Sequence, residues 1–359
     1  MVDLGDTSTT ASAVAPLKVS GRTSDVLLLG AAGSTGQLIA AELVANGLSV
    51  RLAGRRREPL DQLARALAAD GATTDVCIVD VSDAASLIAA TASIGVVVST
   101  IGPFARWAAP VIEACLAARL PYVDIANEWS AVRDLLDRDG QALERQVPLI
   151  TGAGFGPGAT EALVLSLVEH ARSAPARVRL AAAAQVSRHG DGVRQTIEES
   201  ISQGSITYRN GHVVRESLGN GAATLTFGGA ERRMLPGPVG DLEAARRSTG
   251  APDVVAYIAG PGEPITGTGS CAWAEIVSAD GSIATAELLT GDGLRATAAI
   301  AAETTRRVLN GAPPGAWTAT RLFGPTLVID ATGARVRVDG TSGLSVLAPQ
   351  GEAHGHQHA

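Results

Sequence analysis

The sequence predicts an α/β fold with a doubly wound parallel sheet and a second α/β domain whose sheet is mixed or antiparallel. Two observations carry this prediction. Over residues 24–151, short apolar runs alternate with segments of helical spacing, the pattern of a parallel sheet covered by helices on both faces. Over residues 205–290, short strand-like runs follow one another with loops between them, which is typical of a mixed or antiparallel sheet.

Residues 25–57 predict the first strand–helix–strand unit of a dinucleotide-binding, Rossmann-type domain. An apolar strand enters a Gly-x-x-Gly-x-x-Gly turn, and an apolar-faced helix and a second apolar strand follow. The three glycines would allow a sharp turn, close approach of the backbone to a pyrophosphate, and tight packing of helix on strand; they are, in that order, Gly30, Gly33 and Gly36. Ser34 and Thr35 complete this turn, and the N-terminus of the helix that follows would hold the phosphates with its free N–H groups.

The end of the second strand favours NADP(H) as the cofactor. An NAD enzyme usually places Asp or Glu there for the ribose 2′-hydroxyl. This chain has Gly54 and then Arg55, Arg56 and Arg57. A guanidinium can bind a 2′-phosphate, so we expect Arg55 and Arg56 to do so. The alternative is a solvated basic helix start, which the helix dipole disfavours.

Two further strand ends supply expected cofactor contacts. Asp80 ends the third strand and is expected beside the adenine ring, although it could instead cap the following loop. The fourth strand ends at Ser99, and the segment after it is expected to form the wall against the nicotinamide, because Gly-Pro gives a rigid turn with close backbone approach. The residues of this wall are Thr100, Ile101, Gly102, Pro103 and Phe104.

Candidate catalytic residues follow the fifth strand. Asp124 and Glu128, with Tyr122 nearby, could bind a substrate ammonium group or relay a proton, whereas Asp124 could also simply cap the next helix. Tyr208 is a third catalytic candidate. Trp107 and Thr196 are the expected substrate contacts.

Composition excludes several classes of function. The net charge of −7 argues against a nucleic-acid or anionic-membrane surface, and Lys18, the only lysine, makes Schiff-base chemistry improbable. The scattered histidines form no metal pattern, so no metal is expected. The three cysteines indicate a reducing compartment, and no apolar run reaches the ~18 residues of a membrane span. We therefore expect a cytoplasmic protein that binds a small molecule.

The chain divides into five expected segments. They are a flexible lead at 1–23, the cofactor domain at 24–151, a substrate or dimerisation domain at 152–292, a C-terminal return to the cofactor domain at 293–338, and a flexible tail at 339–359. The second sheet could pair in a homodimer. Local patterns also predict an N-cap at Ser82 and a hairpin of Thr326–Asp330 with Arg335–Val338.

Several of these stretches resemble the saccharopine dehydrogenase-like NAD(P)-binding reductases, above all their bacterial branch. They are VLLLGAAGSTG…RLAGRR, VVVSTIGPFARWAAPVIEACLAARLPYVDIANE and TGAGFGPGATEAL. The resemblance implies a Rossmann domain that uses NADPH, a second domain closing over it, and a C-terminal return to the first. The chain departs from the family at Ala126-Asn127-Glu128, where Gly-Glu usually follows the Tyr-x-Asp motif.

These features predict an NADPH-dependent oxidoreductase, a reductase that transfers hydride to a C=C, C=N or C=O group of a small or carrier-linked metabolite. Specialised metabolism is the expected setting. Two alternatives stay open. One is a non-enzymatic NADP(H)-sensing or partner-binding Rossmann protein, because no proton donor stands out. The other is an NAD-linked amino-acid dehydrogenase.

Overall fold

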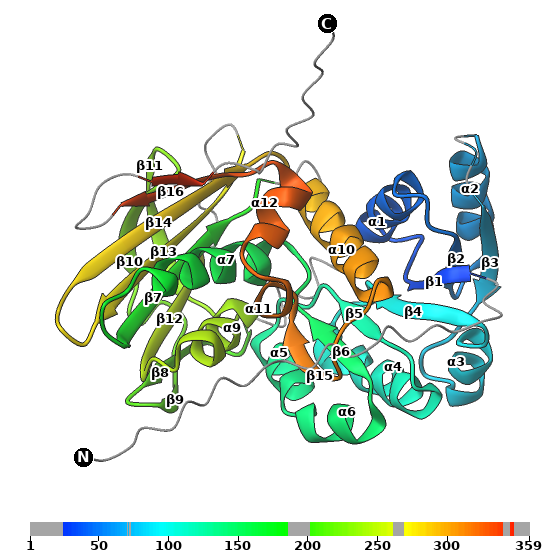
Figure 1. The fold of residues 1–359 in the computed structure, drawn as a ribbon, viewed down its shortest axis with the longest axis horizontal. Coiled ribbons are helices and arrows are strands. Elements are labelled where there is room, and N and C mark those ends of the chain that lie inside the picture. Colours follow the sequence, from blue (N-terminus) through cyan, green and yellow to red (C-terminus); the bar gives the residue numbers. More distant parts are fainter. Residues whose placement is uncertain are drawn as a thin grey trace, which may run out of the picture.

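The computed structural model describes residues 24–69, 71, 73–185, 202–260, 269–339 and 345–347. In this part of the chain, helices join a seven-stranded sheet to a ten-stranded sheet, and the predicted α/β fold class is confirmed (Figure 1). The seven-stranded sheet is called the dinucleotide sheet below, and the ten-stranded sheet is called the second sheet.

The dinucleotide sheet is wholly parallel, with the strand order β15-β6-β5-β4-β1-β2-β3. Its strands are β1 (Ser24–Leu29), β2 (Val50–Gly54), β3 (Thr74–Ile78), β4 (Ile94–Ser99), β5 (Tyr122–Asp124), β6 (Pro148–Thr151) and β15 (Gly315–Thr318). The helices between these strands are α1 (Ser34–Ala45), α2 (Arg57–Ala68), α3 (Ala84–Ala90), α4 (Phe104–Ala118), α5 (Trp129–Leu136) and α6 (Asp139–Arg145).

The central strands β1 and β4 of the dinucleotide sheet are buried on both faces, which explains why they are nearly continuous apolar runs. Val26 and Leu28 of β1 belong to one hydrophobic cluster, whereas Leu27 and Leu29 belong to a second cluster on the opposite face. Helices α1 and α2 contribute to the first cluster, and α3 and α4 contribute to the second. A strand covered on both sides needs apolar residues at every position.

The second sheet has the order β10-β11-β12-β7-β13-β14-β16-β17, and β8 and β9 join it through β12. Its strands are β7 (Pro175–Ala183), β8 (Ser205–Arg209), β9 (His212–Glu216), β10 (Ala223–Phe227), β11 (Ala230–Pro236), β12 (Asp253–Ala259), β13 (Ser270–Ser278), β14 (Ile283–Thr290), β16 (Arg335–Asp339) and β17 (Ser345–Leu347). It is mixed, since β7 pairs with β12 in parallel and with β13 antiparallel. Helices α7 (Phe155–Glu169) and α9 (Gly240–Thr249) pack on each other and against this sheet.

Helix α10 (Gly293–Leu309) lies between the two sheets and packs against α1, α7 and α12 (Figure 1). Its first turn is capped by the Asp292 carboxylate, which accepts hydrogen bonds from the backbone N–H groups of Leu294 and Arg295. After α10 the chain runs back to the dinucleotide sheet, where β15 pairs in parallel with β6. Short helices α11 (Ala319–Phe323) and α12 (Thr326–Thr332) follow.

Two local predictions are wrong. Thr326–Asp330 is not a strand of a hairpin but part of α12, which ends at Gly333 with φ +63°, and β16 pairs with β14 and β17 instead. A short apolar run fits a strand and a buried helix equally well, so tertiary packing decided between them. The N-cap of α3 is Asp83, whose carboxylate accepts from the N–H of Ala85, because Ser82 hydrogen-bonds to Asp80.

Some expectations fall outside the described residues. These are the lead at 1–23, most of the tail at 339–359, and the expected substrate contact Thr196. Ser345–Leu347, within the expected tail, form β17. Among the described helices, none combines the length and the apolar character that a membrane crossing requires.

Candidate cofactor and reaction site

The turn after β1 is built around contacts that only glycine permits. Gly30 has φ +80°, and a Cβ atom there would lie 2.6 Å from the Oγ1 atom of Thr100. At Gly36, inside α1, a Cβ atom would lie 2.2 Å from the carbonyl oxygen of Gly30 and 2.9 Å from that of Ala31. The first turn of α1 therefore rests directly on the backbone that leaves β1.

The turn after β1 is also tied to the end of β4. The N–H of Thr100 donates to the carbonyl of Leu29 at 3.0 Å, and its hydroxyl donates to the carbonyls of Leu29 and Gly30 at 3.0 and 3.2 Å. Leu29 and Ser99 are register partners in the parallel ladder. The glycine turn and the expected nicotinamide wall thus form one continuous edge.

The start of α1 has the features of an anion site. Gly33 is its N-cap and supplies no side-chain cap, and both Gly33 and Ser34 are exposed. The N–H groups of Ser34, Thr35 and Gly36 have no partner within the helix, since the first turn of any helix leaves its donors free. A pyrophosphate placed here would accept from these donors and lie at the positive end of the helix dipole.

The end of β2 presents exposed arginines and no acid. Arg55 and Arg56 are exposed, and Arg56 is the N-cap of α2. Arg57 instead lies within the helix and pairs with Asp61 at 3.8 Å. Within the described residues, Arg55 and Arg56 form no ion pair closer than 4 Å.

Asp80 lies next to this arginine pair, because β2 and β3 are neighbours in register. Its carboxylate accepts from the hydroxyl and N–H of Ser82 at 2.7 and 2.9 Å. These bonds, together with the nearby Arg55 charge, hold the pKa of the exposed Asp80 carboxyl below its usual value. Asp80 is therefore ionised and already shapes the loop after β3, and its expected contact with adenine stays a prediction.

The end of β4 continues into the Gly102–Pro103 turn, whose peptide bond is cis, and then into α4 at Phe104. Phe104 is buried, Trp107 is half-buried, and the guanidinium of Arg106 lies 4.5 Å from the centre of the Trp107 ring. The N–H of Phe104 donates to Oε1 of Glu128 at 2.8 Å. The structure thus brings the expected nicotinamide wall into contact with one of the expected catalytic carboxylates.

Asp124 lies at the end of β5 and is buried, and both of its carboxylate oxygens accept hydrogen bonds. Its Oδ1 atom accepts from the Thr151 hydroxyl at 2.7 Å and from the N–H groups of Ala126 and Gly152 at 3.0 and 3.3 Å. Its Oδ2 atom accepts from the hydroxyl of the buried Tyr122 at 2.9 Å. Burial raises the pKa of the Asp124 carboxyl to about 6, against the opposing effect of these bonds. The cluster joins the ends of β5 and β6, and its role in proton transfer stays a prediction.

The Asp124 carboxyl should make stability depend on pH with a defined sign. Its pKa of about 6 in the folded protein exceeds the 3.8 of an ordinary aspartate side chain, so the folded protein holds this proton more tightly. The contribution of this proton to the free energy of unfolding is complete below about pH 4 and is lost as pH rises through about 6. The difference between the two pKa values corresponds to about 3 kcal/mol. Urea denaturation across this range should show the unfolding free energy of the wild type falling relative to that of Asp124→Asn. A constant difference between the two proteins would contradict the buried, raised-pKa assignment.

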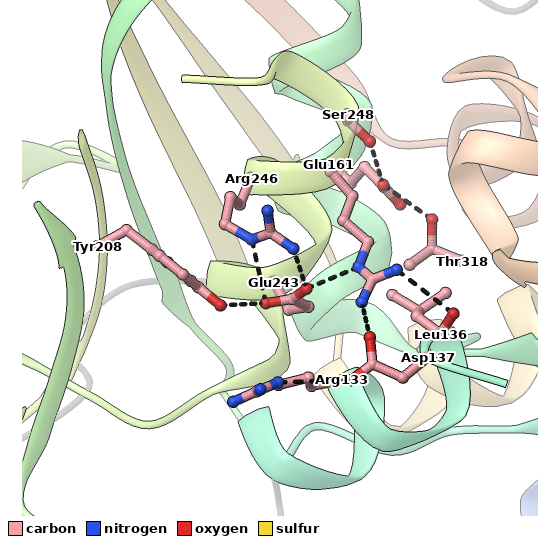
Figure 2. Close-up of polar contacts among 10 residues, drawn as sticks. Arg133, Leu136, Asp137, Glu161, Tyr208, Glu243, Arg246, Ser248 and Thr318 are labelled. Atoms are coloured by element: carbon pink, nitrogen blue, oxygen red, sulfur yellow. Dashed lines mark hydrogen bonds and ion pairs between the residues drawn. The ribbon is translucent and has the colours of Figure 1, made fainter. Parts of the chain in front are cut away.

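Tyr208 lies in β8 of the second sheet and is engaged with α9 rather than with the cofactor edge. Figure 2 shows its hydroxyl donating to Glu243, to which Arg246 also donates. Arg247 donates to the same carboxylate. Burial opposes ionisation of Glu243, but the hydrogen bonds from Arg246, Tyr208 and Arg247 lower the pKa of its carboxyl. Arg247 also bonds to Asp137, just after α5. The cluster fastens α9 to the dinucleotide sheet's helices.

The structure therefore gathers the expected cofactor residues along one edge and separates some of the others. The glycine turn, the arginines and the wall after β4 lie at the carboxyl ends of parallel strands, and Asp124 and Glu128 lie beside them. Tyr208 belongs to the second sheet, and Thr196 is outside the described residues. Sequence reasoning missed the Glu243 cluster, for which the spacing of Glu243 to Arg246 and Arg247 was an available helical signal.

Comparisons with known proteins agree with this geometry. Residues 26–151 match the family described as the saccharopine dehydrogenase NADP binding domain. Curated relatives include a trans-acting enoyl reductase of Mycobacterium tuberculosis, 33% identical over 137 residues, which make up 37% of this chain and 33% of that protein. A putative trans-acting enoyl reductase of the same species is 32% identical over 154 residues, covering 42% of this chain and 37% of that protein. The chain thus spans about a third of the length of the curated relatives it matches.

One solved structure matches nearly the whole chain. It is apo, histidine-tagged saccharopine dehydrogenase (L-Glu forming) from Saccharomyces cerevisiae, with a TM-score of 0.61 and 14% sequence identity. The match covers 90% of this chain and 100% of that one. At this identity it shows a shared fold, including both the parallel sheet and the mixed sheet.

Proposed function

From the match of residues 26–151 to the saccharopine dehydrogenase NADP binding domain family, we propose that the chain is an NADPH-dependent reductase. The observation that carries the proposal is the edge formed by the open start of α1 and the exposed Arg55 and Arg56, with no acid at the end of β2. This edge offers donors for a pyrophosphate and cations for a 2′-phosphate.

The cofactor would lie across the carboxyl ends of the dinucleotide sheet, from Asp80 and the arginines to Thr100–Phe104. When bound, NADPH supplies a hydride from its nicotinamide ring. The chain's own contribution is to orient that ring against the turn after β4, with the backbone of Thr100 to Pro103 as a wall and Trp107 at its rim. Apolar packing around this turn would keep water from the reacting face.

We further propose that the hydride acceptor is a C=C, C=N or C=O group of a small or carrier-linked metabolite. The names of the mycobacterial relatives favour the C=C case, that is, an enoyl substrate. Asp124, Glu128 and Tyr208 remain the candidates for a catalytic role, and Trp107 and Thr196 for substrate contact. We also propose that residues 152–292 form a substrate or dimerisation domain, that the protein is a homodimer, and that it is located in the cytoplasm.

The direct test is stopped-flow oxidation of NADPH with an enoyl thioester, a cyclic imine and a ketone. We expect oxidation with one of the three, with deuterium from C4-labelled NADPH recovered in the product. The Gly36→Ala variant serves as the control for turnover outside this site. Binding of NADPH without turnover of any class would contradict the reductase assignment.

Binding without turnover would favour the alternative of a non-enzymatic NADP(H)-binding protein. One observation supports this alternative. The carboxylates of Asp124, Glu128 and Glu243 all accept hydrogen bonds from the protein itself. None of these three groups points to a substrate by its contacts alone.

A further inference from the structure

We propose that Glu128 is a positioning residue for the nicotinamide half of the cofactor, and that it ties the turn after β4 to the loop before α9. This inference rests on the proposed function, since it assumes that NADP(H) lies along the dinucleotide sheet. It assigns Glu128 a role through the backbone of Phe104 rather than through contact with a reacting atom.

The side chain of Glu128 caps a helix other than its own. It is 3% exposed, its Oε1 atom accepts from the N–H of Phe104 at 2.8 Å, and its Oε2 atom accepts from the N–H of Asn127 at 3.2 Å. Phe104 is the first residue of α4, and Pro103 at the N-cap supplies no side-chain cap. The carboxylate therefore satisfies a donor that the helix itself leaves free, and it lies at the favourable end of the dipole.

This bond fixes the part of the wall nearest the expected nicotinamide. Phe104 directly follows the Gly102–Pro103 turn, so the position of its N–H sets where that turn ends. Without Glu128, the buried N–H of Phe104 would lose its acceptor. The turn would then relax toward whatever partner it could reach. The effect should be largest at the nicotinamide and smallest at Arg55 and Arg56, which are expected at the other end of the cofactor.

The backbone of Glu128 is itself held by the second sheet. Glu128 forms an isolated antiparallel bridge with Val239, the N–H of Trp129 donates to Pro238 at 2.9 Å, and the N–H of Gly240 donates to Asn127 at 2.8 Å. Residues 237–239 connect β11 to α9, whose first residue is Gly240, and a Cβ atom at Gly240 would lie 2.7 Å from Cγ2 of Val132 in α5. The contacts thus run from the second sheet through Glu128 to the cofactor wall.

The role can be tested with two ligands that differ only in the nicotinamide ring. The dissociation constants of NADPH and 2′-phospho-ADP-ribose should be measured by calorimetry for the wild type, Glu128→Ala and Glu128→Gln. We expect Glu128→Ala to raise the dissociation constant of NADPH about tenfold and to change that of 2′-phospho-ADP-ribose by less than about twofold. Glu128→Gln keeps one acceptor and should restore most of the loss. Amide exchange at Phe104 should be faster in Glu128→Ala.

Two further variants separate positioning from general stability. Glu161→Gln alters an equally buried carboxylate, bonded to Ser248 and Thr318, and should leave the ratio of the two dissociation constants unchanged. Gly240→Ala should raise the dissociation constant of NADPH more than that of 2′-phospho-ADP-ribose, because the added methyl group would collide with Val132 and displace the loop before α9. Should Glu128→Ala fail to fold, Glu128→Gln and Gly240→Ala decide the same comparison.

The outcomes distinguish this inference from the proposed function. A wild type that binds neither ligand overturns the proposed function and the inference with it. If the wild type binds NADPH more tightly than 2′-phospho-ADP-ribose, and Glu128→Ala and Gly240→Ala keep the same ratio, that result overturns the positioning role alone. Equal binding of both ligands by the wild type also overturns it, because the wall would then make no contact with the ring.

Discussion

Replacing Gly36 by alanine is expected to weaken NADPH binding by at least about 100-fold and to lower the free energy of unfolding by about 1–3 kcal/mol. The added Cβ atom would lie 2.2 Å from the carbonyl oxygen of Gly30 and 2.9 Å from that of Ala31. Both are backbone atoms, so α1 must move away from β1 and take with it the N–H groups that we expect to bind the pyrophosphate. Calorimetric titration with NADPH and urea denaturation measure the two effects.

A helical glycine without such neighbours provides the matched control. Gly140 lies in α6, and a Cβ atom there would meet nothing within 4 Å. Gly140→Ala should therefore stabilise the protein by up to about 1 kcal/mol, because alanine is the better helix former, and should leave NADPH binding unchanged. Tight NADPH binding by Gly36→Ala would contradict the placement of the pyrophosphate at the start of α1.

Removal of both arginines at the end of β2 should abolish the preference for NADPH over NADH. Hydrogen bonds to a charged group contribute about 1.5–3 kcal/mol each, so we expect Arg55→Ala/Arg56→Ala to weaken NADPH about 100-fold. NADH lacks the 2′-phosphate, and its dissociation constant should change by less than about twofold. Arg55→Asp should go further and favour NADH, since a carboxylate repels the phosphate and accepts from a 2′-hydroxyl. Titration with both dinucleotides at one fixed salt concentration measures the ratio.

Arg57→Ala is the control for this pair. Arg57 is the next residue, but its guanidinium is directed to Asp61 within α2, so its loss should leave the cofactor preference in place. An equal loss of NADPH and NADH affinity in the double variant would indicate that Arg55 and Arg56 support the fold of this edge rather than read the 2′-phosphate. It would also reopen the NAD-linked dehydrogenase hypothesis.

The dinucleotide sheet was predictable because its signals are local. Strands buried on both faces are continuous apolar runs, and the glycine turn, the strand before it and the helix after it lie within one short segment. The second sheet was predicted only in outline. The strands β8 and β11 and the helix α9 were not anticipated, because their pairing partners are distant in sequence and their burial patterns follow from those partners.

The roles of the acidic residues show where local reasoning ends. Asp124 and Glu128 were visible as acids after a strand, yet their partners Thr151 and Phe104 lie on other elements. The apolar run at Thr326–Asp330 became a helix for the same reason, since its packing against α10 was not encoded in its own spacing.

Sequence alone thus predicts the edge at which we expect the cofactor, because the glycine spacing, the missing acid and the arginines at 55 and 56 are properties of one contiguous stretch. Tertiary structure decided how the carboxylates are used. A carboxylate's pKa, its accepted hydrogen bonds and its access to a ligand depend on groups brought close in space, as Thr151 is to Asp124 and Phe104 is to Glu128. The contact of Glu128 with the loop before α9 exists only because folding sets two sheets against each other, and no pattern within either segment carries that information.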